Sequence, residues 1–324
     1  MKIVFMGTPS FAKDSLEAIY NAGHEILAVV TNPDKPKGRG MKMVCSPVKE
    51  YALEKNLKIY QPIKVRNNDE FLNEIKKLNP DVICVVAYGK ILPKEILEIP
   101  KKGCVNVHGS ILPKYRGAAP IQWAVINGES KTGITTMYMD EGMDTGDMIL
   151  QKEVEIGKNE TTGELWERLS KIGGELLVKT LEKIEKNIAP RIPQTGDFSM
   201  APMLTKEISK IDWENKSAKE ICNLIRGLNP IMGAYSTLNG KKLKFWKAEV
   251  IDINNIEGIE NIDKIDINNK KNGQIIISNS KKGLFIKGKD GIISILEIQG
   301  ENSKKMSILD FLRGNQLKEN EIFE

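Results

Sequence analysis

An alternation of strand-like and helix-like segments over the first 190 residues constrains the fold most strongly. Short apolar runs rich in β-branched residues occur at Ile3–Met6, Ile26–Thr31, Val82–Ala87 and Cys104–His108. Amphipathic helical patterns lie between them at Phe11–Ala22, Ser46–Lys55 and Asp69–Leu78. This order predicts an α/β unit, a doubly wound, mostly parallel Rossmann-like sheet with helices on both faces. A long amphipathic helix, Thr161–Lys186, is predicted to close the unit.

A segment dense in proline and glycine follows, and beyond it the pattern changes. Ala189–Gly196 breaks every periodicity, so residues 190–206 are predicted to be a linker between domains 1–189 and 207–324. The second domain is predicted to be a small OB-like β-barrel or curled sheet, with one helix at Ser217–Gly227 and several short β-type runs. Asn239-Gly240 between two of these runs signals a hairpin. The Asn- and Ile-rich stretch 253–272 is predicted to be a variable loop.

Composition limits where the protein works. The chain has no apolar run of about 18 residues, and its first residues are typical of a strand and not of a signal peptide, so we expect a cytoplasmic protein with no membrane partner. Four cysteines, scattered without a CxxC pair, indicate neither disulfides nor a metal site. The net charge of +5 permits a nucleic-acid partner without demanding one.

Only two histidines are available for acid–base chemistry. His24 follows Gly23 after a predicted helix, where an imidazole commonly caps carbonyls, and is expected to be structural. His108 ends a predicted strand, and ligands of open α/β sheets bind at that edge. Asn106 lies two residues earlier and therefore on the same face. A structural pair satisfied by loop carbonyls remains an alternative.

The residues that follow carry a resemblance to a known family. Asn106-x-His108 is followed by Ser110-Ile111-Leu112-Pro113, and further along by Asp140-x-Gly142-x-Asp144-x-Gly146. Together these motifs resemble the folate-dependent formyltransferases. The continuation Arg116–Gln122 (Arg-Gly-Ala-Ala-Pro-Ile-Gln) is most similar to the branch that acts on methionyl-tRNA. The similarity extends from Met1 to about Arg313.

The resemblance implies an enzyme that moves the formyl group of 10-formyltetrahydrofolate to the amino group of initiator methionyl-tRNA, with no metal and no NAD. It implies Asn106, His108 and Asp144 as the catalytic residues. Formyl transfer needs side chains of these three types: an amide can bind the oxyanion, an imidazole can shuttle the proton and a carboxylate can orient the ring. From the residues alone, Asp140 and Asp147 compete with Asp144 for the last role.

Donor and acceptor contacts are implied by the same resemblance. The folate is expected to contact Ala87, Tyr88, Gly89, Ile91, Ser110, Ile111, Leu112 and Pro113, with the loop 139–144 lining the pterin. For tRNA, the eleven-residue connection 33–43 carries Lys35, Lys37, Arg39 and Lys42, a charge suited to phosphates. A solvated loop is the alternative. Lysines interleaved with aromatics at Lys241–Lys247, and at Lys281, Lys282, Lys287 and Lys289, suit nucleic acid or simply the wet face of a strand.

Four other functions fit the sequence less well. A dinucleotide-binding dehydrogenase would need GxGxxG after the first strand, whereas Gly7-Thr8-Pro9 stands there. A binding module without catalysis would not need the Asn106, His108 and Asp144 set. Sugar-amine formyltransferases share both domains with the predicted fold and remain the nearest alternative, whereas the purine-pathway enzyme resembles the first domain only.

For the oligomeric state of the protein, we expect a monomer.

Overall fold

The computed structural model describes residues 1–37, 42–251 and 269–324, which form two compact units. Unit 1 comprises residues 1–121, 131–155 and 166–203, and unit 2 comprises residues 122–130, 156–165 and 204–324. In the described part of the chain, no helix combines the length and the apolar character needed to cross a membrane.

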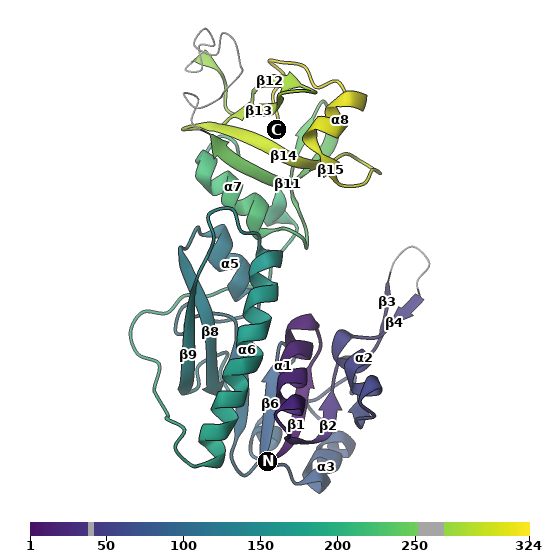
Figure 1. The fold of residues 1–324 in the computed structure, drawn as a ribbon, viewed down its shortest axis with the longest axis vertical. Coiled ribbons are helices and arrows are strands. Elements are labelled where there is room, and N and C mark those ends of the chain that lie inside the picture. The colour runs from purple at the N-terminus through teal and green to yellow at the C-terminus, as the bar shows by residue number, and fades with distance from the viewer. Residues whose placement is uncertain (38–41, 252–268) are drawn as a thin grey trace. The chain divides into compact units, whose positions relative to one another are not determined.

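A seven-stranded sheet forms the centre of unit 1 (Figure 1). Its strand order is β5-β2-β1-β6-β7-β8-β9. The pairs from β5 to β7 are parallel, and β8 and β9 join antiparallel. The predicted doubly wound, mostly parallel architecture is therefore confirmed. The strands are β1 (Lys2–Gly7), β2 (Glu25–Val30), β5 (Ile59–Tyr60), β6 (Val82–Val86), β7 (Cys104–His108), β8 (Lys131–Tyr138) and β9 (Met148–Glu155).

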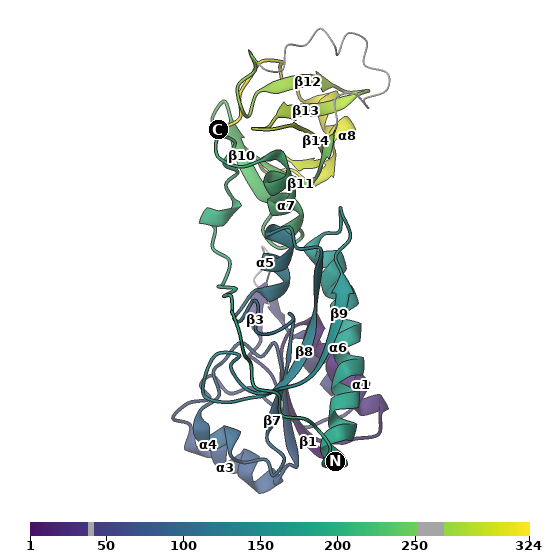
Figure 2. The same cartoon turned by 90° about the vertical axis from the view of Figure 1, so that its left-hand side faces the viewer.

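Helices cover both faces of this sheet, and Figure 2 shows α3 and α4 on one face with α1 and α6 on the other. Two of these helices begin at a side-chain N-cap: Ser46 caps α2 ahead of Pro47, and Asn68 caps α3. A serine hydroxyl in α6, that of Ser170, donates to Asp14 of α1 at 2.5 Å. The helices are α1 (Ser10–Asn21), α2 (Pro47–Glu54), α3 (Asp69–Leu78), α4 (Lys94–Leu97) and α6 (Thr162–Glu185).

Strand alternation decides which face carries polar groups. Cys104 of β7 packs in the core that Phe71 and Ile75 of α3 and Ile96 of α4 share. Because side chains of a strand alternate, Asn106 projects from the same face as Cys104. His108 follows on that face at the carboxyl end of β7.

The basic connection differs from the predicted loop. Its described flanks pair as two short antiparallel strands, β3 (Lys35–Lys37) and β4 (Lys42–Val44). The basic composition of residues 33–43 did not predict these two strands. At the base of the hairpin, Asp34 accepts hydrogen bonds from Lys49 at 2.6 Å and Gln61 at 2.9 Å.

Most of the segment predicted as a linker belongs to unit 1. Ile192 and Met148 exchange backbone hydrogen bonds at 2.8 and 3.0 Å, and Arg116 bridges to Met200. Within the predicted linker, residues 190–203 thus lie in unit 1 and residues 204–206 in unit 2. The domain bounds 1–189 and 207–324 stay a prediction.

Unit 2 is built on a six-stranded antiparallel sheet, as the short β-type runs predicted. Asn239 and Gly240 both have positive φ and form the predicted hairpin turn between β10 and β11. Most of the predicted variable loop, residues 253–268, lies outside the described residues. The elements are α5 (Pro120–Ile126, mostly in this unit), η1 (Glu207–Ser209), α7 (Ala218–Gly227), β10 (Ala234–Leu238), β11 (Lys241–Ile251), β12 (Ile275–Asn279), β13 (Gly283–Lys287), β14 (Ile292–Gln299), β15 (Met306–Ser307) and α8 (Ile308–Gly314).

Candidate active site

The end of β7 holds a buried imidazole between a carbonyl and a carboxylate. His108 is 5% exposed, and its Nε2 lies 2.9 Å from the carbonyl oxygen of Tyr115. Because a carbonyl only accepts, Nε2 must carry the proton. Nδ1 then faces Oδ2 of Asp144 at 3.6 Å. A loop carbonyl therefore satisfies one ring nitrogen, and the other is left for chemistry.

Asp144 is the carboxylate that meets both residues of β7. Its Oδ1 accepts from Nδ2 of Asn106 at 3.3 Å, and its Oδ2 accepts from the backbone N–H of Gly117 at 2.8 Å. Asp144 adopts a left-handed φ of +54°. Such a φ is uncommon for a residue with a side chain and has to be held by its surroundings.

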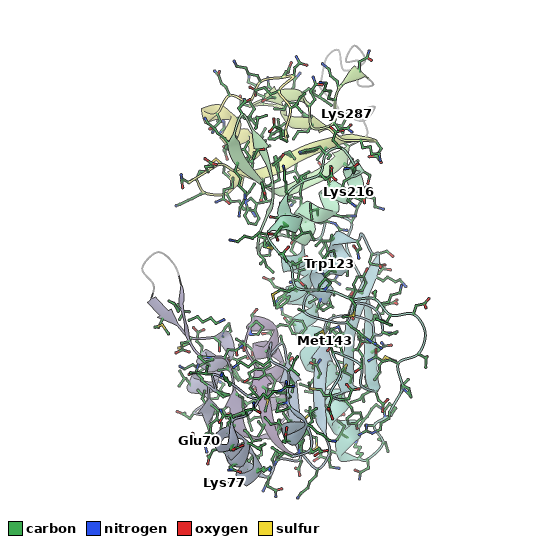
Figure 3. The ribbon with its side chains drawn as sticks, turned by 180° about the vertical axis from the view of Figure 1, so that it is seen from behind. Glu70, Lys77, Trp123, Met143, Lys216 and Lys287 are labelled. Atoms are coloured by element: carbon green, nitrogen blue, oxygen red, sulfur yellow. The ribbon has the colours of Figure 1, made fainter. Side chains whose placement is uncertain are left out.

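The two competing aspartates are engaged elsewhere. Asp140 accepts from the N–H of Gly142 at 3.0 Å and the hydroxyl of Thr145 at 2.7 Å, so it shapes the loop. Asp147 lies 3.6 Å from Arg191. Neighbouring Met143, 55% exposed and labelled in Figure 3, marks the position of the loop. The geometry thus brings Asn106, His108 and Asp144 together.

The segment Ser110–Pro113 follows β7 directly. Ser110 is fully buried, and its hydroxyl donates to the carbonyl of Lys114 at 2.6 Å. Leu112 is buried too, and its carbonyl accepts from Gln151 at 2.9 Å. The hydroxyl of Ser110 and the backbone carbonyl of Leu112 thus hold the loop itself, whereas Ile111 and Pro113 are half-buried at its surface.

The segment Ala87–Ile91 follows β6, the neighbouring strand. Ala87 and Gly89 are exposed and have positive φ, and Ile91 is 67% exposed. Tyr88 differs from the expectation for a ligand contact, because its side chain is only 2% exposed and packs into the core. Its carbonyl accepts from Nδ2 of Asn32 at 3.0 Å. The groups of this segment that a flat ligand can reach are the backbone of Ala87 and Gly89 and the side chain of Ile91.

Sequence reasoning missed a basic pocket beside Ile91. Its volume is about 460 Å³, and it is lined by Lys64, Val65, Arg66, Asn67, Lys90 and Ile91. The amine of Lys90 donates to the carbonyls of Pro62 and Ile63 at 2.7 and 2.9 Å. Burial, and then the nearby charge of Lys35, lower the pKa of Lys90. The available signal was the basic pair Lys64-x-Arg66, but it precedes Ala87 by more than twenty positions in the sequence, and only the fold brings it to Ile91.

The predicted tRNA contacts are spread over both units. Lys35 is exposed on β3, Lys37 and Lys42 pair in the hairpin, and Arg39 lies outside the described residues. In unit 2, the amine of Lys242 lies 3.4 Å from the centre of the Tyr235 ring, and the amine of Lys244 lies 5.7 Å from the centre of the Trp246 ring. Lys287 is buried and its amine bonds the carbonyl of Gly288, so it is structural.

Comparison with known proteins gives matches over both units. The family described as "Formyl transferase" matches residues 1–181, and "Formyl transferase, C-terminal domain" matches residues 203–316. A methionyl-tRNA formyltransferase of Clostridioides difficile is 52% identical over 319 residues, which is 98% of each chain. That of Caldanaerobacter subterraneus is 48% identical and covers 100% of each chain.

Solved structures of lower identity share the fold. An N-formyltransferase from Helicobacter canadensis, in complex with folinic acid and dTDP-3-aminofucose, has a TM-score of 0.65 at 23% identity and covers 93% of this chain and 99% of its own. HypX from Aquifex aeolicus with tetrahydrofolic acid has a TM-score of 0.64 at 16% identity, with 100% of this chain and 51% of its own covered. At these identities the likeness concerns the fold alone.

Proposed function

The chain belongs to the formyl transferase family, and we propose that it transfers the formyl group of 10-formyltetrahydrofolate to the free amino group of methionyl-tRNA. The product, N-formylmethionyl-tRNA, serves translation initiation. The observation that supports this most directly is the meeting of Asn106, His108 and Asp144 at the carboxyl end of β7. We further propose that the enzyme acts in the cytoplasm as a monomer.

The proposed chemistry divides the roles as follows. The amino nitrogen of the acceptor attacks the formyl carbon, and negative charge develops on the formyl oxygen. An amide nitrogen carries two N–H donors. One of those on Asn106 is used on Asp144, and the second can bind the developing oxyanion.

Proton transfer falls to the imidazole. As the new C–N bond forms, Nδ1 of His108 accepts the proton that the amine loses. As the bond between the carbon and N10 of the folate breaks, the same proton passes to N10. Asp144, 3.6 Å from Nδ1, stabilises the imidazolium between the two steps.

For the donor, the exposed backbone of Ala87 and Gly89 with Ile91 offers a shelf for the pterin. Ile111 and Pro113 contact the donor at the end of β7. The glutamate tail of a folate is anionic, and the pocket lined by Lys64, Arg66 and Lys90 has the complementary charge. Ile91 belongs to both places, so shelf and pocket are continuous.

For the acceptor, the hairpin with Lys35, Lys37, Arg39 and Lys42 binds phosphates of the tRNA. The second domain, 207–324, contributes lysines that accompany aromatic rings, such as Lys242 with Tyr235 and Lys244 with Trp246. These contacts add affinity that depends on salt, because phosphate neutralisation releases counterions.

A direct assay tests the proposal. Purified protein is supplied with 10-formyltetrahydrofolate and either methionyl-tRNA or a dTDP-aminosugar, and formylated product is measured with His108→Ala as the blank. We expect formylation of methionyl-tRNA alone. Transfer to the aminosugar, with none to tRNA, would instead assign the chain to the sugar-amine enzymes.

A further inference from the structure

A glutamine outside the proposed catalytic set bonds the loop that carries Asp144. Nε2 of Gln194 donates to the carbonyl of Asp144 at 2.8 Å and to the carbonyl of Gly146 at 2.9 Å. Both acceptors belong to the turn in which Asp144 has its left-handed φ. One amide group therefore ties the backbone on either side of Thr145.

An arginine fixes the orientation of this amide. Nε and Nη2 of Arg116 both donate to Oε1 of Gln194, at 3.0 and 2.7 Å. With Oε1 facing the guanidinium, Nε2 has to face the two carbonyls. A rotation of the amide by 180° would set Nε2 against a cation that can only donate.

The same arginine precedes the residue that holds the carboxylate. The N–H of Gly117 donates to Oδ2 of Asp144 at 2.8 Å. Asp144 is thus held by its backbone through Gln194 and by its side chain through Gly117, and Arg116 connects the two. The contacts form a closed ring.

The ring is anchored by the segment after Gln194. The N–H of Arg116 donates to the carbonyl of Ser199 at 2.8 Å, and the N–H of Ala201 donates to the carbonyl of Arg116 at 2.7 Å. Gly117 has a φ of +119°, and a Cβ there would lie 2.8 Å from the carbonyl oxygen of Ala201. Chain segments far apart in sequence therefore meet closely at this point.

We propose that Gln194 and Arg116 are positioning residues that hold Asp144 in register with His108. The inference builds on the role of Asp144 under the proposed function. Without the amide of Gln194, the turn loses two hydrogen bonds that hold Asp144 in its strained conformation. Displacement of a reacting group by about 1 Å can cost on the order of 100-fold in rate.

The experiment compares Gln194→Ala and Gln194→Glu with wild type in steady-state kinetics. Gln194→Glu keeps an acceptor for Arg116 but replaces the donor by an oxygen facing two carbonyls. We expect both variants to lose about 10- to 100-fold in kcat, with KM for each substrate within about 3-fold of wild type. Adding Arg116→Lys to Gln194→Ala should cost little more, because one ring is broken only once.

Lys102→Ala is the matched control. Its amine bonds the carbonyl of Ile184 and Oδ1 of Asn187, which ties two segments of unit 1 without touching the site. The control should keep wild-type kcat. Normal kcat in both Gln194 variants would overturn the proposal, and so would an equal loss of kcat in Lys102→Ala.

Imidazole NMR gives a readout independent of turnover. The chain has two histidines, so a His24→Gln variant assigns both ring signals. Gln194→Ala should shift the His108 signals and leave those of His24 in place. Unshifted His108 signals would overturn the positioning role. Absence of formyl transfer in the wild type would instead defeat the proposed function, while the NMR comparison would still test the positioning.

Discussion

Oδ2 of Asp144 lies 3.6 Å from Nδ1 of His108, and the two residues are held by different means. His108 ends β7, an interior strand of the seven-stranded sheet, and its backbone is held by pairing with Thr135 of β8. Asp144 sits in a connection between β8 and β9, with a φ of +54°. The distance between Asp144 and His108 therefore depends on the contacts that hold the loop between β8 and β9.

The first prediction concerns this pair. His108→Ala should lower kcat by about 100- to 10,000-fold, because the ring nitrogen that faces Asp144 is lost. Binding of the donor, measured by calorimetry, should persist. His24→Ala is the control: burial lowers the pKa of His24, which lies beside the amino group of Met1 and away from the site. A His108→Ala enzyme with near-normal turnover would exclude the proposed mechanism.

The second prediction concerns the basic pocket. Lys64→Ala and Arg66→Ala should each raise KM for the donor by about 2- to 5-fold, the size of a largely exposed ionic contact. The increase should be larger for a polyglutamylated donor than for the monoglutamate, with kcat unchanged.

Lys76→Ala, which removes an exposed charge from α3, is the control for this second prediction. Steady-state kinetics with each donor at saturating tRNA provide the measurement. Equal KM values for both donors in all variants would show that the tail binds elsewhere.

Much of the fold could be predicted because periodic patterns encode local structure. The helix predicted at Asp69–Leu78 has those bounds in the structure, and the strand predicted at Cys104–His108 does too. The shared face of Asn106 and His108 followed from the period of two alone. The two positive φ values at Asn239 and Gly240 followed from the residues that tolerate them.

What could not be predicted depends on contacts between distant segments. No local rule separates Asp144 from Asp140 and Asp147, since the difference lies in which one meets β7. The prolines around Gln194 indicated a linker, yet this segment lies in unit 1 because its polar groups find partners near Arg116. Nor does the sequence around Tyr88 tell whether the ring of this residue faces a ligand or, as the structure has it, the core.

The third prediction links pH to the stability of unit 2. Glu220 closes a capping box with Ser217 at the start of α7. A hydrogen bond from Lys216, then those from the N–H and hydroxyl of Ser217, lower the pKa of Glu220 to about 2. A folded pKa below the unfolded value of about 4.3 means that the stabilisation is present above pH 4.3 and is lost as the pH falls toward 2.

Glu220→Gln should therefore lower Tm at neutral pH, and its difference from wild type should narrow between about pH 5 and pH 3. Glu319→Gln, at an exposed acid of the same unit, should show little difference at either pH. Thermal unfolding followed by circular dichroism measures both. A Tm difference that stays constant across this range would show that the carboxylate of Glu220 contributes nothing as a charge.

The last prediction concerns the hairpin, whose described strands place Lys35 opposite Val44 and Lys37 opposite Lys42. Arg39 stands between them in sequence and lies outside the described residues. A guanidinium binds phosphate in a bidentate fashion or stacks on an unpaired base, and an amine does neither. Arg39→Lys should therefore reduce kcat/KM for methionyl-tRNA although the charge is kept. KM for the donor should be unchanged, because the residues proposed to bind it lie on other segments.

Neutralising the three lysines of the hairpin separates charge from shape. A variant with Lys35, Lys37 and Lys42 changed to alanine should weaken tRNA binding, and the slope of log K against log salt should fall by roughly 0.7–0.9 for each phosphate that the protein no longer neutralises. The control changes Lys76, Lys77 and Lys101, which are exposed and carry the same total charge. If the control lowers the slope of log K against log salt equally, tRNA binding responds only to the net charge of the protein and not to the position of the lysines. If Arg39→Lys and the hairpin variant both keep wild-type kcat/KM for tRNA, the hairpin does not bind the acceptor.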